Sequence, residues 1–121
     1  ACRKNADVNS CDHDATSLEI VIADAGSFAR RSLVTSGDSY DILLVDPPRQ
    51  GLDENVRQMA MQGEFTHLIY ISCGHDALVR DLAYLSGVFQ VVDCELLDLF
   101  PQTDAVETLV HLRRQRDGNQ E

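Results

Sequence analysis

Residues 66–87, THLIYISCGHDALVRDLAYLSG, carry the clearest folding signal in this chain. Residues 66–72 form a short apolar run rich in isoleucine, which is typical of a strand buried on both faces of a parallel sheet. Residues 75–87 then place apolar side chains at helical spacing and end with a glycine, where a left-handed cap is common. A buried strand that leads directly into a helix is the repeating unit of an α/β domain.

The same alternation of apolar runs and helix-like segments extends toward the amino terminus: 17–24, 26–37, 40–46 and 51–63. Such alternation predicts right-handed crossovers and a mostly parallel sheet, in which ligands bind beyond the carboxyl ends of the strands. Asp24, Asp46 and Cys73 each stand at or just beyond the end of a predicted strand. We therefore expect the candidate chemistry to share one edge of the sheet.

The final third of the chain has a different pattern. Residues 89–101 (FQVVDCELLDLFP) and 105–115 (AVETLVHLRRQ) are two strand-like runs joined by a short turn, which predicts an antiparallel pair that closes the sheet. The predicted fold class is therefore α/β, with a mostly parallel sheet and an antiparallel carboxyl-terminal strand pair. We expect one domain over residues 1–112 and a solvated polar tail over residues 113–121.

Composition limits the class of protein. The chain has 121 residues and 44% apolar content, which is enough for one hydrophobic core. Its 10 basic and 20 acidic side chains give a net charge of −10, which repels phosphate backbones and anionic membranes. No apolar run approaches the roughly 20 residues that cross a bilayer, and residues 1–9 do not resemble a signal peptide. We expect a cytoplasmic protein without a membrane partner.

The cysteines, at positions 2, 11, 73 and 94, lack the spacing of a zinc or iron–sulfur site, so we expect free thiols and no metal. The glycines are too widely spaced for a GxGxxG turn or a P-loop. The segment ISCGH (71–75) places Cys73 at a strand exit, where an α/β enzyme can carry a nucleophile. Cysteine is also among the most often buried residue types, so inert packing at the strand end is the alternative.

Four segments resemble one family in their order and spacing: RKNADVN (3–9), LLVDPPRQGLD (43–53), IYISCGHDALVRDLAYL (69–85) and LLDLFPQTDAVETLVHL (96–112). Together they resemble the carboxyl-terminal catalytic region of RNA uracil-5-methyltransferases, over nearly the whole chain from Arg3 to Leu112. The resemblance implies a partial Rossmann-like methyltransferase domain that uses S-adenosylmethionine to methylate carbon 5 of uridine in tRNA or rRNA. In complete members, a cofactor-binding start and RNA-binding domains precede this region.

The resemblance also implies a role for each matched side chain. Cys73 adds as a thiolate to carbon 6 of uracil, which makes carbon 5 nucleophilic, and Glu107 stands at the position of the base that removes the carbon 5 proton. A solvated strand position is the alternative for Glu107. Asp24 matches an acidic position near the cofactor adenine, and a plain carboxylate at a helix amino terminus is the alternative there.

The segment DPPR (46–49) supplies the remaining predicted site residues. By the same resemblance, Asp46 is expected to bind the cofactor, and Pro47 and Arg49 are expected to bind the RNA substrate. A rigid turn is the alternative interpretation, because proline fixes φ and restricts the residue before it. Arg49 and His75 are the candidates for an electropositive neighbour that favours the Cys73 thiolate.

This chain departs from the family pattern at two places. Gly74 and His75 follow the cysteine where the family usually has Asn-Pro, and Ala105 stands where the family commonly has a histidine two residues before Glu107. These departures fit either a divergent enzyme or a degenerate methyltransferase-fold module that acts in binding or assembly without catalysis. A thiol-dependent enzyme of another class is a further alternative, but His75 is too close in sequence to Cys73 for an ordinary relay.

The opening residues, ACRKNADVN, look like the end of a helix, and no strand with a glycine-rich turn precedes residues 17–24. The sequence therefore predicts a fragment that lacks the first strands of the methyltransferase sheet. Such a sheet has exposed edges, which promote self-association. We expect this 121-residue chain to be inactive alone.

Overall fold

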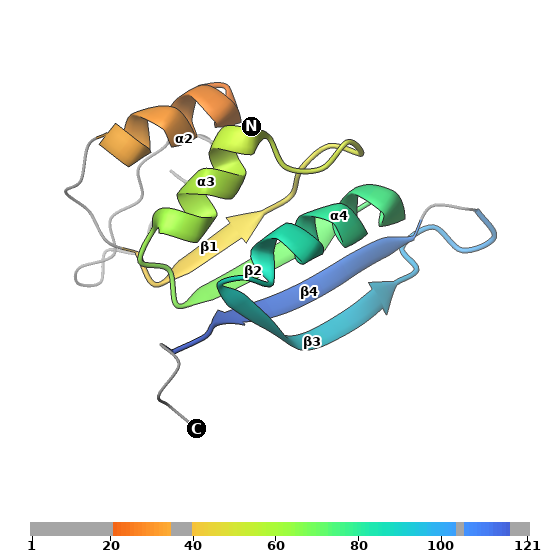
Figure 1. Cartoon of the computed structure of the whole chain (residues 1–121). Helices are drawn as coiled ribbons and strands as arrows, with labels where there is room; N and C mark the ends of the chain where they lie inside the picture. The colour runs from red at the N-terminus through yellow and green to blue at the C-terminus, as the bar shows by residue number, and fades with distance from the viewer. Residues whose placement is uncertain (1–20, 35–39, 104–105, 117–121) are drawn as a thin grey trace, which may run out of the picture.

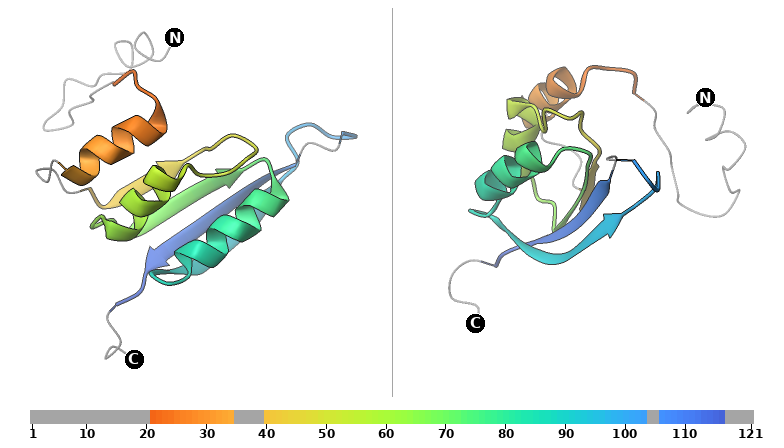
Figure 2. Two further views of the ribbon diagram at one scale, coloured as in Figure 1. Left: turned by 45° about the horizontal axis from the view of Figure 1, so that its top comes forward. Right: turned by 90° about the vertical axis from the view of Figure 1, so that its right-hand side faces the viewer.

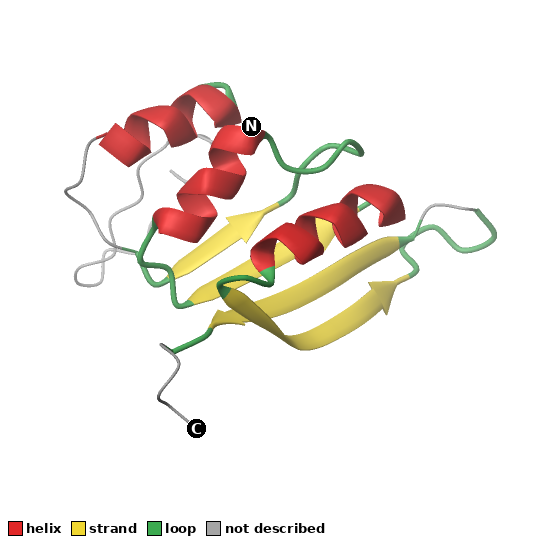
Figure 3. Ribbon diagram, in the orientation of Figure 1, coloured by secondary structure: helices red, strands yellow, loops and turns green. Residues whose placement is uncertain are grey.

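The computed structural model describes residues 21–34, 40–103 and 106–116 (Figure 1). Figure 3 shows how helices and strands alternate along the first part of this chain before two strands follow in succession. The elements are α2 (Ala25–Val34), β1 (Ile42–Val45), α3 (Glu54–Gln62), β2 (His67–Ser72), α4 (His75–Leu85), β3 (Phe89–Leu97) and β4 (Glu107–Arg114). The predicted α/β class is confirmed.

The strands form one sheet in the order β1-β2-β4-β3. β1 and β2 pair in parallel, whereas β4 pairs antiparallel with both β2 and β3. The antiparallel carboxyl-terminal pair is therefore present as expected. The described part of the sheet is mixed rather than mostly parallel, because β4 inserts between β2 and β3 instead of adding at the outer side of β3.

The predicted strand at 17–24 falls partly outside the described residues, because residues 17–20 are not among them. Val21 to Asp24 are described, and they are not in a strand. The helix end predicted within residues 1–9 also lies outside the described residues. The left-handed caps expected at the glycines that end the helix-like segments are wrong for α3 and α4. Gly63 ends α3 with φ −70° and ψ 173°, an extended conformation, and Gly87, which follows α4, does not have a positive φ.

The helices cover one face of the sheet (Figure 2). Along β2 and β4 buried residues alternate with half-buried ones, so one face of each strand packs against α3 and α4. The main hydrophobic core consists of Ala29, Leu52, Val56, Ala60, Leu68, Tyr70, Leu78, Leu85, Phe89, Val110 and Leu112.

The opposite face of the sheet is apolar and exposed along β1. Leu43 and Val45 pack against the core, while Ile42 and Leu44 alternate with them and are 56% and 59% exposed. A strand with apolar side chains on both faces is typical of a sheet that is covered on both sides. Within the described residues, only one side has helices against it (Figure 2).

β4 runs two residues into the segment that the sequence indicates as a tail. Arg114 anchors this extension, because its guanidinium donates to the carbonyl oxygens of Phe65 at 2.6 Å, Ala60 at 3.0 Å and Met61 at 3.3 Å. The same group lies 4.8 Å from the centre of the Phe89 ring. Burial lowers the pKa of Arg114 from its ordinary value. Arg114 therefore ties the end of β4 to the end of α3 and is not a free basic side chain.

Candidate functional site

The ends of three strands meet at one edge of the sheet. β1 ends at Val45 and β2 ends at Ser72, while the antiparallel β4 begins there with Glu107. The β2–β4 register ends with Ser72 opposite Thr108. Cys73 is the next residue after β2, and Glu107 is the residue before Thr108 at the start of β4. The topology therefore places the two predicted catalytic residues at the same end of these paired strands.

The backbone around Cys73 is held by its neighbours. The buried Ser72 hydroxyl donates to the carbonyl oxygen of Gly74 at 2.9 Å and accepts from the Gly74 N–H at 3.1 Å. The Leu78 N–H then donates to the same carbonyl at 3.1 Å, which starts α4. Cys73 lies between these fixed points and is exposed as a free thiol. The inert buried packing considered for this cysteine is not what the structure shows.

Residues 46–52, here called the DPPR loop, lie against the start of α4. A Cβ atom added at Gly74 would stand 2.7 Å from the carbonyl oxygen of Arg49, closer than real contacts allow. The glycine that departs from the family pattern is therefore what lets the loop backbone approach α4 this closely. Arg49 thus lies against the residue that follows Cys73, and its side chain is exposed.

Three other predicted site residues line an open cleft of about 810 Å³. Asp24 comes from the start of α2, and Asp46 and Pro47 come from the end of β1 and the DPPR loop. Apolar side chains that include Phe28, Val56 and Met59 complete the walls. The residues that line the cleft do not include Cys73, Arg49 or Glu107, so the predicted site has two neighbouring parts.

Asp24 caps α2. Its carboxylate accepts from the Ser27 N–H at 3.0 Å and from the Ser27 hydroxyl at 3.1 Å, while its carbonyl accepts from the Phe28 N–H at 2.9 Å. The backbone hydrogen bond from Ser27, followed by the bond from its hydroxyl, holds the pKa of Asp24 below its ordinary value. The helix-cap interpretation is therefore correct, and the same carboxylate also faces the cleft.

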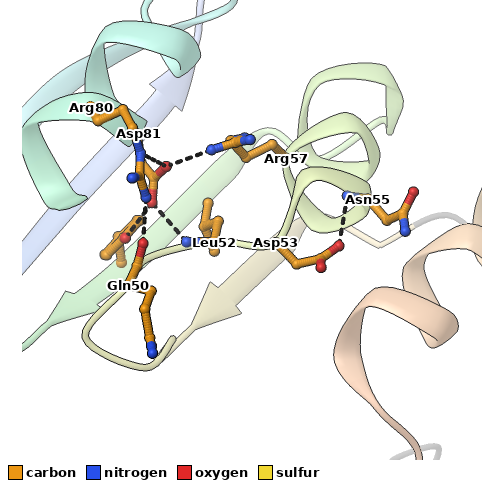
Figure 4. A network of polar contacts seen from close by, with 8 residues as sticks. Gln50, Leu52, Asp53, Asn55, Arg57, Arg80 and Asp81 are labelled. Carbon is orange, nitrogen blue, oxygen red and sulfur yellow. Dashed lines mark hydrogen bonds and ion pairs between the residues drawn. The ribbon is translucent and has the colours of Figure 1, made fainter.

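The sequence interpretation missed a buried polar network around Asp81 (Figure 4). The Asp81 side chain is fully buried in α4, and Oδ2 accepts from the Leu52 N–H at 2.8 Å and from the Tyr70 hydroxyl at 2.7 Å. Burial, and next the bond to Asp81, raise the pKa of Tyr70 far above its ordinary value. A signal was available, because Asp81 shares helical spacing with the buried Leu78 and Leu85.

The described residues contain neither a membrane-spanning helix nor a cluster of metal ligands. No helix there is long and apolar enough to cross a membrane. In the same ranges, no group of three or more His, Cys, Asp or Glu side chains has the arrangement to hold a metal ion.

The chain matches a family model described as tRNA (Uracil-5-)-methyltransferase over residues 13–115. An RNA methyltransferase of Listeria innocua, itself uncharacterised, is 41% identical over 81 residues, which are 67% of this chain and 18% of that protein. The 23S rRNA (uracil(747)-C(5))-methyltransferase of Pyrococcus abyssi is 43% identical over 76 residues, which are 62% of this chain and 18% of that protein. The chain thus spans less than a fifth of the length of these relatives.

A solved structure shares the fold. The Pyrococcus abyssi tRNA (uracil-54, C5)-methyltransferase, in complex with S-adenosyl-L-homocysteine, matches with a TM-score of 0.72 and 26% sequence identity. The match covers 92% of this chain and 25% of that one. The described elements therefore have the arrangement of part of a methyltransferase domain.

Proposed function

Because this chain belongs to the tRNA (uracil-5-)-methyltransferase family, we propose that it forms the carboxyl-terminal part of an enzyme that methylates carbon 5 of uridine in RNA. The observation that supports the proposal is the β2–β4 register, which ends with Ser72 opposite Thr108 and so leaves Cys73 and Glu107 at the same end of the two strands. Residues 1–112 belong to the catalytic domain, and residues 113–121 follow it as a short polar segment. The RNA is a tRNA or an rRNA, and the enzyme works in the cytoplasm.

Cys73 activates the uracil ring. Carbon 5 of uracil is a weak nucleophile until a group adds to carbon 6 and moves electron density across the ring. The Cys73 thiolate forms a bond to carbon 6, and the electron pair of the carbon 5–carbon 6 double bond moves into an enolate. The exposed thiol at the start of α4 is accessible to a base that has been turned out of an RNA strand.

Glu107 completes the reaction. S-adenosylmethionine, when bound, supplies the methyl group that carbon 5 takes up. The Glu107 carboxylate then removes the proton from carbon 5, the double bond re-forms, and the carbon 6–sulfur bond breaks with return of the electron pair to Cys73. Glu107 is half-buried at the first position of β4, at the end of the sheet where Cys73 follows β2, which supports this role.

The cleft fits a nucleoside-bearing cofactor. Its volume of about 810 Å³ and its apolar walls suit an adenosine group, and the Asp24 and Asp46 carboxylates can accept from amino and hydroxyl groups. Pro47 lines this cleft and Arg49 packs against Gly74, the neighbour of Cys73; in this proposal both contact the RNA substrate. The solved relative with S-adenosyl-L-homocysteine supports this assignment, because that molecule is what remains after S-adenosylmethionine gives up its methyl group.

This 121-residue chain has no activity by itself in this proposal. The chain spans less than a fifth of its curated relatives, so the remaining RNA and cofactor contacts come from elsewhere in a longer protein. Alone, it self-associates through the exposed strand β1.

The deciding experiment compares Cys73→Ala with Cys94→Ala in the full-length protein. Both thiols are exposed, and only Cys73 lies at the strand edge with Glu107. With tritiated S-adenosylmethionine and unmodified tRNA and rRNA transcripts, Cys73→Ala should abolish methyl transfer, whereas Cys94→Ala should keep it. A Cys73→Ala enzyme that retains more than about one per cent of the rate, a loss under ~3 kcal/mol, would show that catalysis does not pass through this thiol. A wild-type protein without any transfer would favour the degenerate binding module.

A further inference from the structure

We propose that Asp81 is a positioning residue: it holds the DPPR loop against the start of α4, and so fixes Arg49 against Gly74, the neighbour of Cys73, and Asp46 at the cleft. The inference rests on the proposed function, because it concerns the same site. It adds a residue that lies on the buried face of α4 and is not expected to contact RNA or cofactor.

The Asp81 carboxylate joins three elements besides its own helix (Figure 4). Oδ2 accepts from the Leu52 N–H of the DPPR loop at 2.8 Å and from the Tyr70 hydroxyl of β2 at 2.7 Å. Oδ1 lies 3.3 Å from Nη1 of Arg57 in α3 and 3.8 Å from Nε of Arg80. A fully buried carboxylate is tolerated when hydrogen bonds and opposite charges surround it in this way.

The loop backbone is shaped to meet this carboxylate. Gly51 has φ of +92°, a conformation that side-chain-bearing residues rarely adopt. A Cβ atom added there would stand 2.6 Å from Oδ2 of Asp81 and 2.7 Å from Nη2 of Arg80. Arg80 also donates from this nitrogen to the Gln50 carbonyl oxygen. Two consecutive residues of α4, Arg80 and Asp81, therefore contact three consecutive residues of the loop, 50–52, and hold them in place.

These contacts of Arg80 and Asp81 also position the loop residues that precede 50–52. The residue directly before them is Arg49, whose carbonyl oxygen packs against Gly74, the neighbour of Cys73. Asp46 and Pro47, three and two residues further back, line the cleft. A loop displaced by about 1 Å costs on the order of 100-fold in rate when it carries groups that orient reactants. Loss of the Asp81 carboxylate should therefore affect the chemistry through the loop.

The test uses two variants that disturb the same contact from opposite sides, in the full-length protein. Asp81→Asn keeps the side-chain size but removes the charge and one of the two acceptor oxygens. In either orientation its amide nitrogen, which donates, faces donors: Leu52 and Tyr70, or Arg57 and Arg80. Gly51→Ala places a methyl group where the carboxylate stands. Tyr70→Phe is the matched control, because it removes the other hydrogen bond to Oδ2 and leaves the Leu52 bond in place.

Amide hydrogen exchange and kcat are measured together. In Asp81→Asn and Gly51→Ala, exchange over residues 49–52 should rise at least about tenfold, because the contact between the loop and the side chain at position 81 is weakened or displaced. Their kcat for methyl transfer to unmodified tRNA and rRNA transcripts should fall at least about tenfold, at saturating S-adenosylmethionine. Tyr70→Phe should lower the thermal midpoint but keep loop exchange and kcat near wild type.

The positioning role is overturned if Asp81→Asn and Gly51→Ala match Tyr70→Phe in both loop exchange and kcat. The exchange measurement does not depend on the chemistry at Cys73. If exchange rises in both loop variants while Cys73→Ala stays active, the covalent mechanism fails and the anchoring of the loop by Asp81 stands. If Asp81→Asn does not fold, a folded Gly51→Ala enzyme is sufficient to decide whether Asp81 positions the loop.

Discussion

Glu107 is expected to act after Cys73, so the two variants should fail at different steps. Glu107→Gln leaves a thiolate that can add to the ring and a ring that can take up the methyl group, but the carbon 5 proton cannot leave. The covalent enzyme–RNA species should therefore accumulate. A denaturing gel with radiolabelled RNA detects it as a shifted band that Cys73→Ala does not form.

Glu95→Gln is the control for this variant, because Glu95 is exposed on β3, opposite Leu109 of β4. It should turn over like wild type. A Glu107→Gln enzyme that also turns over normally, without a shifted band, would assign the base to another residue.

The buried Tyr70 should make the free energy of unfolding decrease as the pH rises into the alkaline range. Its pKa is raised in the folded state, mainly by burial and next by the bond to Asp81. The stabilisation is complete below the unfolded tyrosine pKa of about 10 and is lost as pH rises toward the folded value, because the unfolded state then holds fewer protons. Thermal midpoints measured between pH 8 and about 11 should fall more steeply in wild type than in Tyr70→Phe. Tyr40→Phe, at an exposed ring, should keep the wild-type slope.

Single residues were predictable where a strand end or a motif marked them. Cys73 and Glu107 could be chosen by resemblance, but their pairing depends on the β2–β4 register, which no local pattern contains. The sequence could not distinguish helix capping from cofactor binding for Asp24, because both roles use the same carboxylate at the same edge of the sheet. Asp81 was missed because an acidic residue in a helix usually faces solvent, although it shares helical spacing with the buried Leu78 and Leu85.

At the level of elements, the meeting of the DPPR loop with α4 gives a stability prediction. Gly74→Ala adds a methyl group 2.7 Å from the Arg49 carbonyl oxygen, so the backbone of the loop or of α4 must shift. We expect a loss of about 1–3 kcal/mol, as for other overpacked sites, and a lower thermal midpoint.

Gly87→Ala is the matched control, because the atom nearest to its new Cβ is 3.7 Å away. It should leave the midpoint close to wild type. Equal midpoints for the two variants would mean that the loop yields at no cost, and that Gly74 has no part in seating it.

The helices and strands themselves were largely predictable, and their assembly was less so. The apolar run at 66–72 became β2 (His67–Ser72), and the helical spacing at 75–87 became α4 (His75–Leu85), because period and local propensity agree in both. The left-handed caps were predicted incorrectly at Gly63, which takes an ordinary extended conformation, and at Gly87, which does not have a positive φ. The antiparallel pair was predicted, but the place of β4 between β2 and β3 was not, because the pairing of β4 with β2 joins segments that are far apart in the chain.

For the whole molecule, charge gives the clearest prediction. With a net charge of −10, this chain alone should bind RNA weakly and without sequence preference, because few phosphate counterions can be released. Arg114 does not add to a basic patch, since its guanidinium is occupied by three carbonyl oxygens. Gel-shift titrations with unmodified tRNA at two salt concentrations test this. Submicromolar binding at physiological salt would contradict this prediction and would indicate an RNA-binding surface that the net charge does not predict.

The place of β4 between β2 and β3 has a consequence for synthesis on the ribosome. β4 is made after both of its partners, so β2 and β3 leave the exit tunnel with no strand between them and with open backbone edges. The nascent sheet can be completed only when residues 107–114 emerge and pair with both β2 and β3. A premature stop codon before residue 107 would therefore remove the middle of the sheet instead of trimming its border, and the shortened product would be a substrate for cellular proteases.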